Sequence, residues 1–164
     1  MLETITDSLV SLNKEAAVVI LSALPVSELR GAIPLAVAMG FGPLKSYLLA
    51  VAGNLIPVIP ILFFLQPVSE KLRHIPIFEK FFNWLFERTK RKAALVEKFE
   101  FLGLILFVAV PLPITGAWTG CVAATLFKMR FRYAFCAILI GVLLAGGIVL
   151  TLSLAGKELL ISTH

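Results

Sequence analysis

Hydrophobic positions in this chain form long runs, and prolines and polar residues interrupt them at a few places. The first run, Ala16 to Leu24, has 9 residues, and after a polar stretch a second short run covers residues 35–41. A helix needs about 20 apolar residues to cross a bilayer, so neither run can span alone. Two short arms around a break predict a re-entrant helical hairpin.

Two longer runs can each cross a membrane. Residues 44–65 make an apolar run of 22 residues with Asn54 near its centre, and residues 133–155 make a second one of 23. Pro57 and Pro60 lie in the first run, where the missing backbone donors predict a kinked or loosened helix.

The second half of the chain repeats the order of the first. A short apolar arm at 101–110 precedes a break at Pro111 and Pro113, and a returning arm covers 116–127 with Thr115 as its expected N-cap. Small residues at four-residue spacing, which let helices approach closely in lipid, recur in both halves and in the last span. These small residues are Ala32, Ala36 and Gly40, then Gly116, Gly120 and Ala124, then Ala137, Gly141 and Ala145.

Residues 66–100 differ from the rest in character. They hold eight of the 15 basic residues, five glutamates, and aromatic residues at helical spacing. This pattern predicts an amphipathic helix on the membrane surface, with its basic side toward anionic lipid headgroups. A soluble core helix is the alternative. Nucleic-acid binding is disfavoured because acidic residues interleave with the basic ones.

Composition places the whole chain in a membrane. Of its 164 residues 59% are hydrophobic and 15% charged, with a mean hydropathy of +0.97, against about 45–50% and about 25% in soluble domains. We expect one all-α membrane domain over residues 1–164, with repeats at 15–65 and 101–155 joined by the linker at 66–100.

The basic residues predict the topology. Because positive charge favours the cytoplasmic side, the clusters at 66–100 and 128–132 should share that side, which requires 101–127 to enter the membrane and return. The two repeats are then inverted. We expect a multi-pass protein of the inner (plasma) membrane with both termini outside.

Two charges, Glu28 and Arg30, lie within the first apolar region between Pro25 and Pro34. Charges in lipid are costly and mark functional sites unless they are paired. Glu28 is a candidate proton or cation site, and Arg30 either pairs with it or holds an anionic substrate. Residues two apart do not face each other on a helix, so pairing predicts a non-helical loop between the two prolines. A purely structural ion pair is the alternative.

Further candidate site residues are neutral. Thr115, Trp118 and Thr119 should face Glu28 from the second hairpin, where hydroxyl groups can coordinate a cation or headgroup, or only cap and connect helices. Asn54 either lines the same cavity or joins helices by hydrogen bonds. The chain shows no Ser/His, His-Glu-x-x-His or paired-aspartate arrangement and no Cys/His cluster, so we expect no enzyme, metal or cofactor.

Two segments resemble the small multidrug export protein family of prokaryotes: residues 28–34, Glu-Leu-Arg-Gly-Ala-Ile-Pro, and residues 111–120, Pro-Leu-Pro-Ile-Thr-Gly-Ala-Trp-Thr-Gly. That family is distantly similar to the DedA/VTT membrane proteins. The resemblance implies an inner-membrane transporter with paired re-entrant hairpins and membrane-embedded acidic and arginine residues. The second hairpin of this chain departs from that pattern, because it carries no acidic residue and no arginine.

These observations favour a secondary transporter, proton-coupled, that exports a small amphiphilic or anionic substrate. The alternatives are a flippase or scramblase for a phospholipid or polyprenyl phosphate, and a non-transporting membrane scaffold. Expected partners are membrane lipids and the substrate, and the small size of the domain is consistent with a homodimer.

Overall fold

The computed structural model describes residues 2–72, 93–111 and 115–162, with side chains for residues 13–65, 99–111 and 115–159. The described chain is helical throughout its regular elements, as predicted. The helices are α1 (Leu2–Ala23), α2 (Glu28–Ala38), α3 (Pro43–Leu55), α4 (Val58–Leu72), α6 (Ala93–Ala109), α7 (Ala117–Leu126) and α8 (Phe131–Ser162).

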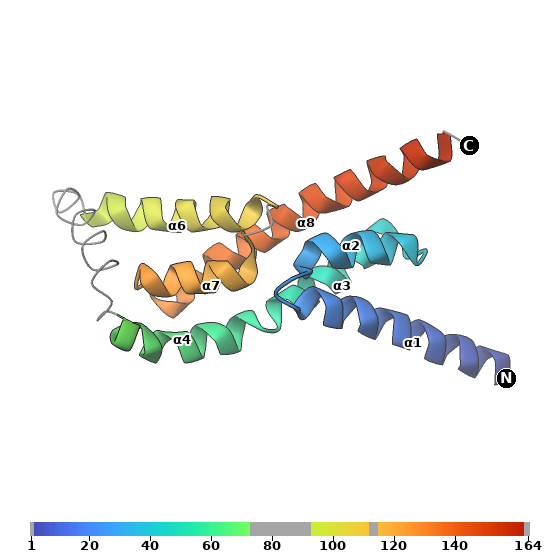
Figure 1. The fold of residues 1–164 in the computed structure, drawn as a ribbon, viewed down its shortest axis with the longest axis horizontal. Coiled ribbons are helices and arrows are strands. Elements are labelled where there is room, and N and C mark those ends of the chain that lie inside the picture. The colour runs from blue at the N-terminus through green and yellow to red at the C-terminus, as the bar shows by residue number, and fades with distance from the viewer. Residues whose placement is uncertain (1, 73–92, 112–114, 163–164) are drawn as a thin grey trace.

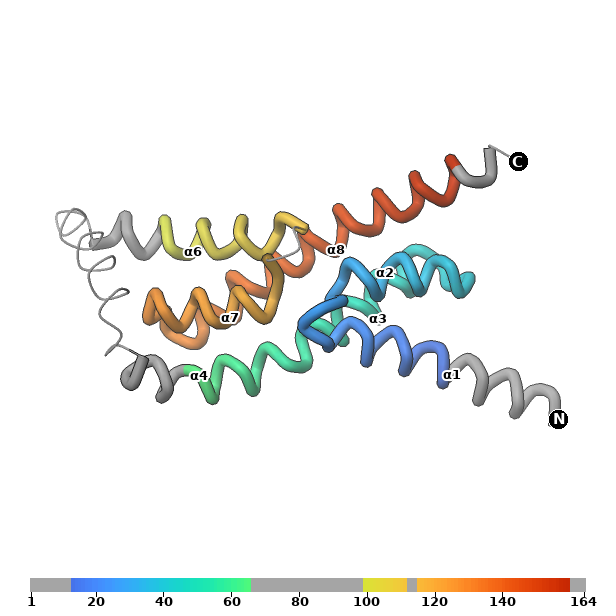
Figure 2. Tube along the Cα trace, viewed as in Figure 1, coloured from blue at the N-terminus to red at the C-terminus, as the bar shows by residue number. Residues whose placement is uncertain are grey.

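The helices form two groups joined by one long helix. Helices α1, α2 and α3 pack together at one end of the molecule, α4, α6 and α7 lie at the other, and α8 runs along both groups (Figure 1). The α1–α2 and α6–α7 pairs are hairpins whose turns meet near the middle of the molecule (Figure 2). Both ends of the chain lie at the end formed by α1–α3.

Two helical segments are long and apolar enough to cross a membrane: Pro43–Leu65, with 23 residues, and Phe131–Leu159, with 29. They match the two predicted spans. The first is broken between α3 and α4 at Ile56 and Pro57, which confirms the predicted loosening. Pro57 has no N–H to donate, so the carbonyl of Gly53 loses its helical partner there.

The first hairpin differs from the prediction in two ways. Its first arm is not a nine-residue helix from Ala16 but a 22-residue helix that begins at Leu2. The expected loop from Pro25 to Pro34 is also wrong, because α2 begins at Glu28 and continues through Pro34. A proline inside a helix removes one hydrogen bond. The neighbouring Ile33 is completely buried, and burial of an isoleucine side chain stabilises the fold by about 1.5–3 kcal/mol.

The expected linker helix at 66–100 lies largely outside the described residues. Its first part, residues 66–72, continues α4, and its last part, residues 93–100, belongs to α6. The second hairpin therefore begins before the predicted arm at 101–110.

Small residues produce the close helix contacts that their spacing predicted. A Cβ added at Gly120 or at Gly141 would lie 2.6 Å from a Val108 side-chain atom, so α6, α7 and α8 meet around Val108. Gly40 is different: it is exposed, has φ +86° and follows the end of α2. The fully buried alanines of these ladders are Ala32, Ala36 and Ala137.

A substitution at Gly53 tests the close contact between α1 and α3. A Cβ there would lie 2.5 Å from the Val19 carbonyl oxygen of α1, so Gly53→Ala must push α1 and α3 apart. We expect a loss of about 1–3 kcal/mol of unfolding free energy, measured as a lower midpoint of thermal unfolding in detergent. The matched control is Gly103→Ala in α6, where an added Cβ meets nothing within 4 Å. Equal midpoints for the two variants would contradict the close packing of α1 and α3.

Candidate functional site

Glu28 begins α2 in an unusual backbone conformation. Its φ is +44°, in the left-handed region that residues other than glycine rarely adopt, and the residue is 5% exposed. Such a conformation costs about 1–3 kcal/mol and persists only where surrounding contacts hold it. The backbone N–H of Glu28 donates to the Leu24 carbonyl of the first hairpin, and its side chain is held by contacts with the second.

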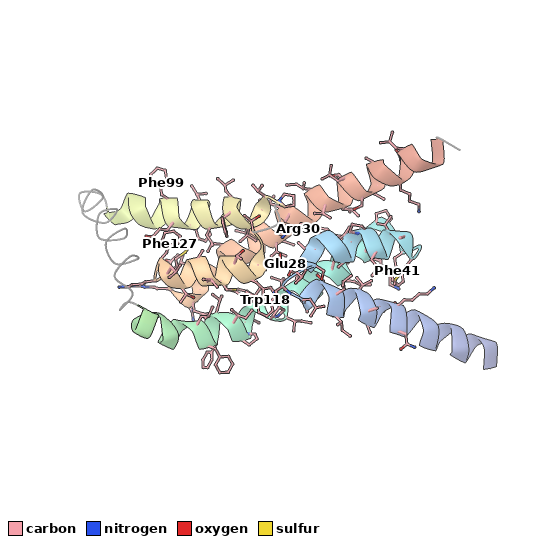
Figure 3. The ribbon with its side chains drawn as sticks, in the orientation of Figure 1. Glu28, Arg30, Phe41, Phe99, Trp118 and Phe127 are labelled. Carbon is pink, nitrogen blue, oxygen red and sulfur yellow. The ribbon has the colours of Figure 1, made fainter. Side chains whose placement is uncertain are left out.

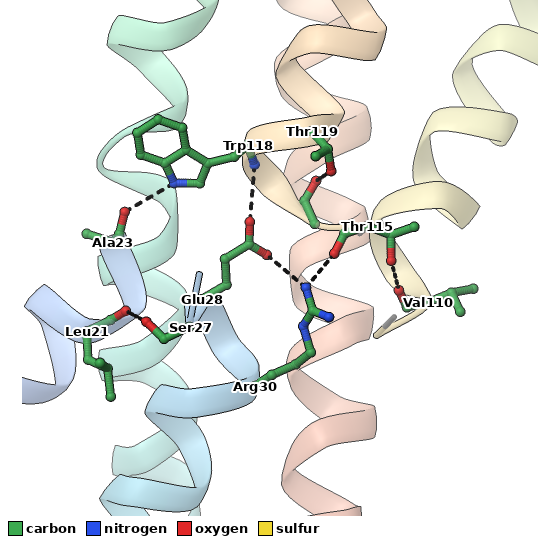
Figure 4. A network of polar contacts seen from close by, with 10 residues as sticks. Leu21, Ala23, Ser27, Glu28, Arg30, Val110, Thr115, Trp118 and Thr119 are labelled. Carbon is green, nitrogen blue, oxygen red and sulfur yellow. Dashed lines mark hydrogen bonds and ion pairs between the residues drawn. The ribbon is translucent and has the colours of Figure 1, made fainter. Parts of the chain in front are cut away.

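The Glu28 carboxylate lies at the N-terminus of α7. Its Oε1 accepts a hydrogen bond from the backbone N–H of Trp118, with 3.4 Å between the heavy atoms (Figure 4). The first N–H groups of a helix have no partner within the helix, and the N-terminus carries a partial positive charge. A carboxylate from the first half therefore caps a helix of the second half.

Arg30 connects Glu28 to the same place. Its Nη2 lies 4.0 Å from Glu28 Oε2 and donates a 2.7 Å hydrogen bond to the carbonyl oxygen of Thr115. The pair was predicted to need a non-helical loop. It forms instead at the start of a helix, because the left-handed backbone of Glu28 departs from helical geometry.

Trp118 returns a hydrogen bond to the first half. Its indole Nε1 donates to the carbonyl oxygen of Ala23 at 3.1 Å. Ala23 is the last residue of α1, and the last carbonyl groups of a helix also have no helical partner. The two hairpin turns thus satisfy each other's exposed backbone groups. Glu28, Arg30 and Trp118 lie together near the middle of the molecule (Figure 3).

Gly116 makes this close approach possible. It is the N-cap residue of α7, without a side-chain capping hydrogen bond. A Cβ at this position would lie 1.8 Å from Glu28 Oε2, so any other residue would displace the carboxylate. From the sequence, Gly116 was expected to begin the returning arm and to belong to a small-residue ladder, but its contact with Glu28 was not predicted. Its place directly after a proline break and before a helix was the available signal.

The prediction that Thr115 is the N-cap residue of the returning arm is wrong. Gly116 holds that position, and Glu28 supplies the hydrogen-bond acceptor that an N-cap side chain would give. The Thr115 hydroxyl instead donates to the carbonyl of Val110 at 2.5 Å, and the Thr119 hydroxyl donates to that of Gly116 at 3.3 Å. Both hydroxyls therefore bond the backbone of their own hairpin.

A cavity of about 10 Å³ lies beside the pair. Asn54, which is 1% exposed, lines it, and the Asn54 Oδ1 atom has no hydrogen-bond partner among the described residues. The structure thus brings Glu28, Arg30, Asn54 and Thr115 to one cavity. The other lining residues include Pro111, Gly116, Ala117, Val142, Ala145 and Val149.

The other predicted site features are partly described. Pro25 lies in the turn between α1 and α2, and Pro111 lines the cavity, whereas Pro113 lies outside the described residues. Within the part of the chain that the structure describes, no group of three or more His, Cys, Asp or Glu residues is placed to hold a metal ion.

In the described residues the regular elements are helices, and two helical segments are long and apolar enough to cross a membrane. The ion pair on α2 lies beside the N-terminus of α7. Together these features indicate a helical membrane protein. The chain belongs to the family described as "Putative small multi-drug export protein", whose model matches residues 28–148. The match begins at Glu28 and covers most of the chain. The family name denotes export rather than a class of enzyme. Neither a search of curated proteins nor a search of solved structures found a match.

A double-mutant cycle tests the contact between Gly116 and Glu28. Gly116→Ala places a methyl group where the carboxylate lies, so it should lower the unfolding free energy by about 1–3 kcal/mol. In a Glu28→Ala background the clash is absent, and the same substitution should cost much less. Thermal unfolding in detergent measures all four proteins.

Gly147→Ala in α8 is the matched control, because a Cβ there meets nothing within 4 Å. Additive effects of the Gly116 and Glu28 substitutions would show that the two residues do not touch.

Proposed function

We propose that this protein is a secondary transporter that couples proton movement at Glu28 to export of a small amphiphilic or anionic substrate. The observation that carries the proposal is the Glu28–Arg30 pair, which is held between two hairpin turns in the middle of a membrane protein. Ionisable groups inside a membrane are expensive, and substrate and proton pathways are among the functions that they mark. The export named by the family supports the same function.

The arrangement of the hairpins favours two re-entrant segments that enter the membrane from opposite sides. Helix α2 has 11 residues and α7 has 10, so each is about 15–17 Å long, roughly half of the 30 Å hydrocarbon layer. Their turns meet between the two ends of α8. Paired broken helices of this kind form the substrate sites of several secondary transporters near the membrane midplane.

Charged residues at the two ends of the molecule support the placement of the two membrane surfaces there. At the end formed by α1–α3, Lys45 pairs with Glu15. At the other end, Lys128, Arg130 and Arg132 are exposed. Positive charge favours the cytoplasmic side, so we assign the three-residue cluster to the cytoplasm and both chain ends to the outside. The two halves are then inverted repeats.

Protonation of Glu28 supplies a coupling mechanism. The charged carboxylate caps α7 and attracts Arg30. A neutral carboxyl group interacts more weakly with a helix N-terminus and with a guanidinium group. Gain of a proton therefore loosens the contact between the hairpins and makes Arg30 available to an anionic group of the substrate.

Glu28→Gln tests proton coupling. The protein is reconstituted in liposomes with a pH gradient, and proton flux is followed with an internal pH-sensitive dye when ethidium or taurocholate is added. We expect the wild type to couple proton flux to one of these probes, and Glu28→Gln to fall to the level of protein-free liposomes. The amide keeps the size of the side chain but cannot titrate.

Glu15→Gln is the matched control, because this carboxylate also forms an ion pair, with Lys45, but lies within α1, which continues beyond it to Ala23. Wild-type flux from folded Glu28→Gln would contradict the proposal. Movement of a fluorescent phospholipid between leaflets, without movement of either probe, would show that the protein translocates lipid and does not export these solutes.

Cysteine labelling tests the inverted hairpins. In a background with Cys121→Ala and Cys136→Ser, single cysteines replace Lys98, Arg130 or Lys45. A membrane-impermeant maleimide should label the first two from one side of the membrane and the third from the other. Labelling of positions 98 and 130 from opposite sides would show that α6 and α7 together cross the membrane.

A further inference from the structure

The Oδ1 atom of Asn54 has no hydrogen-bond partner among the described residues, and this draws attention to the cavity that it lines. Asn54 lies one residue before the end of α3 and is 1% exposed. A buried acceptor without a donor lowers stability, and native structures pair nearly all such groups with protein or ordered water. Among the described residues this atom has no partner, and its side chain lines the cavity beside Glu28 and Arg30.

The size and lining of the cavity limit what it can hold. Its volume of about 10 Å³ is close to the minimum of about 10–15 Å³ that one water molecule needs. A transported solute is too large. Asn54 Oδ1 and the Glu28 carboxylate both require donors, whereas Arg30 is itself a donor. A water molecule, with two donors and two acceptors, can serve all three.

A monovalent cation is a poorer occupant. It would also bind the two oxygen acceptors, but it would lie in the same small cavity as the Arg30 guanidinium, and two positive charges at such distances repel strongly where water is excluded. The remaining lining, which includes Val108, Val142 and Val149, offers apolar side chains.

We propose that this cavity is a site for one water molecule, which is held by Asn54 and is the route by which Glu28 exchanges its proton. As the bound water accepts a proton from the solvent side, it passes one of its own protons to a Glu28 oxygen, so the charge of the carboxylate is neutralised and no cation stays beside Arg30; release follows the reverse path. The exchange role rests on the transport function proposed above. The water site itself rests only on the cavity and on Asn54.

Few other charged or titratable groups are near this position. Arg30 lies on the same helix as Glu28. Cys121 on α7 is close enough to interact electrostatically with Glu28, but its thiol lies 3.9 Å from the carbonyl oxygen of Val58. In the described part of the chain, no further titratable side chain lines the cavity. Proton exchange at Glu28 can therefore be followed without a competing carboxyl group.

The test is the rate at which deuterium replaces the proton on the Glu28 carboxyl group. Infrared spectra of the protein in liposomes, at a pH where Glu28 is protonated, give its carboxyl band by difference from Glu28→Gln. Asn54→Leu keeps the shape of the side chain but removes both hydrogen-bonding atoms. We expect it to slow exchange about tenfold, as loss of one hydrogen bond predicts. Asn54→Ser should restore most of the rate.

Two further variants distinguish loss of the water site from a general disturbance of the fold. Ser46→Ala is the matched control, since Ser46 is another buried polar residue of α3, whose hydroxyl bonds the Phe41 carbonyl away from the cavity. It should exchange at the wild-type rate. Val142→Ile adds one methylene group to the cavity lining from α8, so it should slow exchange even if Asn54→Leu does not fold.

Wild-type exchange in folded Val142→Ile and Asn54→Leu would overturn the proposal, and so would a rate that changes when sodium replaces potassium. The assay contains no substrate. Slowed exchange in these variants, together with a wild type that moves neither transport probe, would therefore support the water site while rejecting the transport function.

Discussion

The contact between the Glu28 carboxylate and the N-terminus of α7 is the interaction on which the middle of this molecule depends. Both hairpins turn in a region that the proposed topology places inside the membrane, where water cannot satisfy backbone groups. Each turn exposes helix ends. The two turns solve this problem for each other: Glu28 accepts from the Trp118 N–H, and the Trp118 indole donates to the Ala23 carbonyl.

The two hairpins contribute unequally to this contact. The first supplies both charges, Glu28 and Arg30, whereas the second supplies the Trp118 N–H, the Thr115 carbonyl and the space left by Gly116. Backbone groups of this kind cannot change their charge. Any change in protonation at Glu28 therefore acts directly on the bond between the halves, which gives the proposed transporter a single site at which proton binding and hairpin movement are coupled.

The sequence predicted the two membrane-length helices and the break at Pro57, because these depend on apolar length and on the positions of prolines. It predicted helix ends less well. Pro34 was expected to end a loop, but α2 begins before it and continues through it. Thr115 was expected to cap α7 because local capping rules do not include a carboxylate from the other half. The role of Gly116 was missed for the same reason, since it depends on Glu28, 88 positions earlier in the chain.

Solid-state nuclear magnetic resonance measures the central contact most directly. Protein in lipid bilayers, labelled with carbon-13 at the Glu28 side-chain carboxyl and nitrogen-15 at the Trp118 backbone amide, should show a dipolar coupling of the size expected for a carboxyl carbon and an amide nitrogen joined by the hydrogen bond between Trp118 N and Glu28 Oε1. A coupling of this size would show that the two hairpin turns meet through the carboxylate. The absence of measurable coupling in folded protein would contradict it.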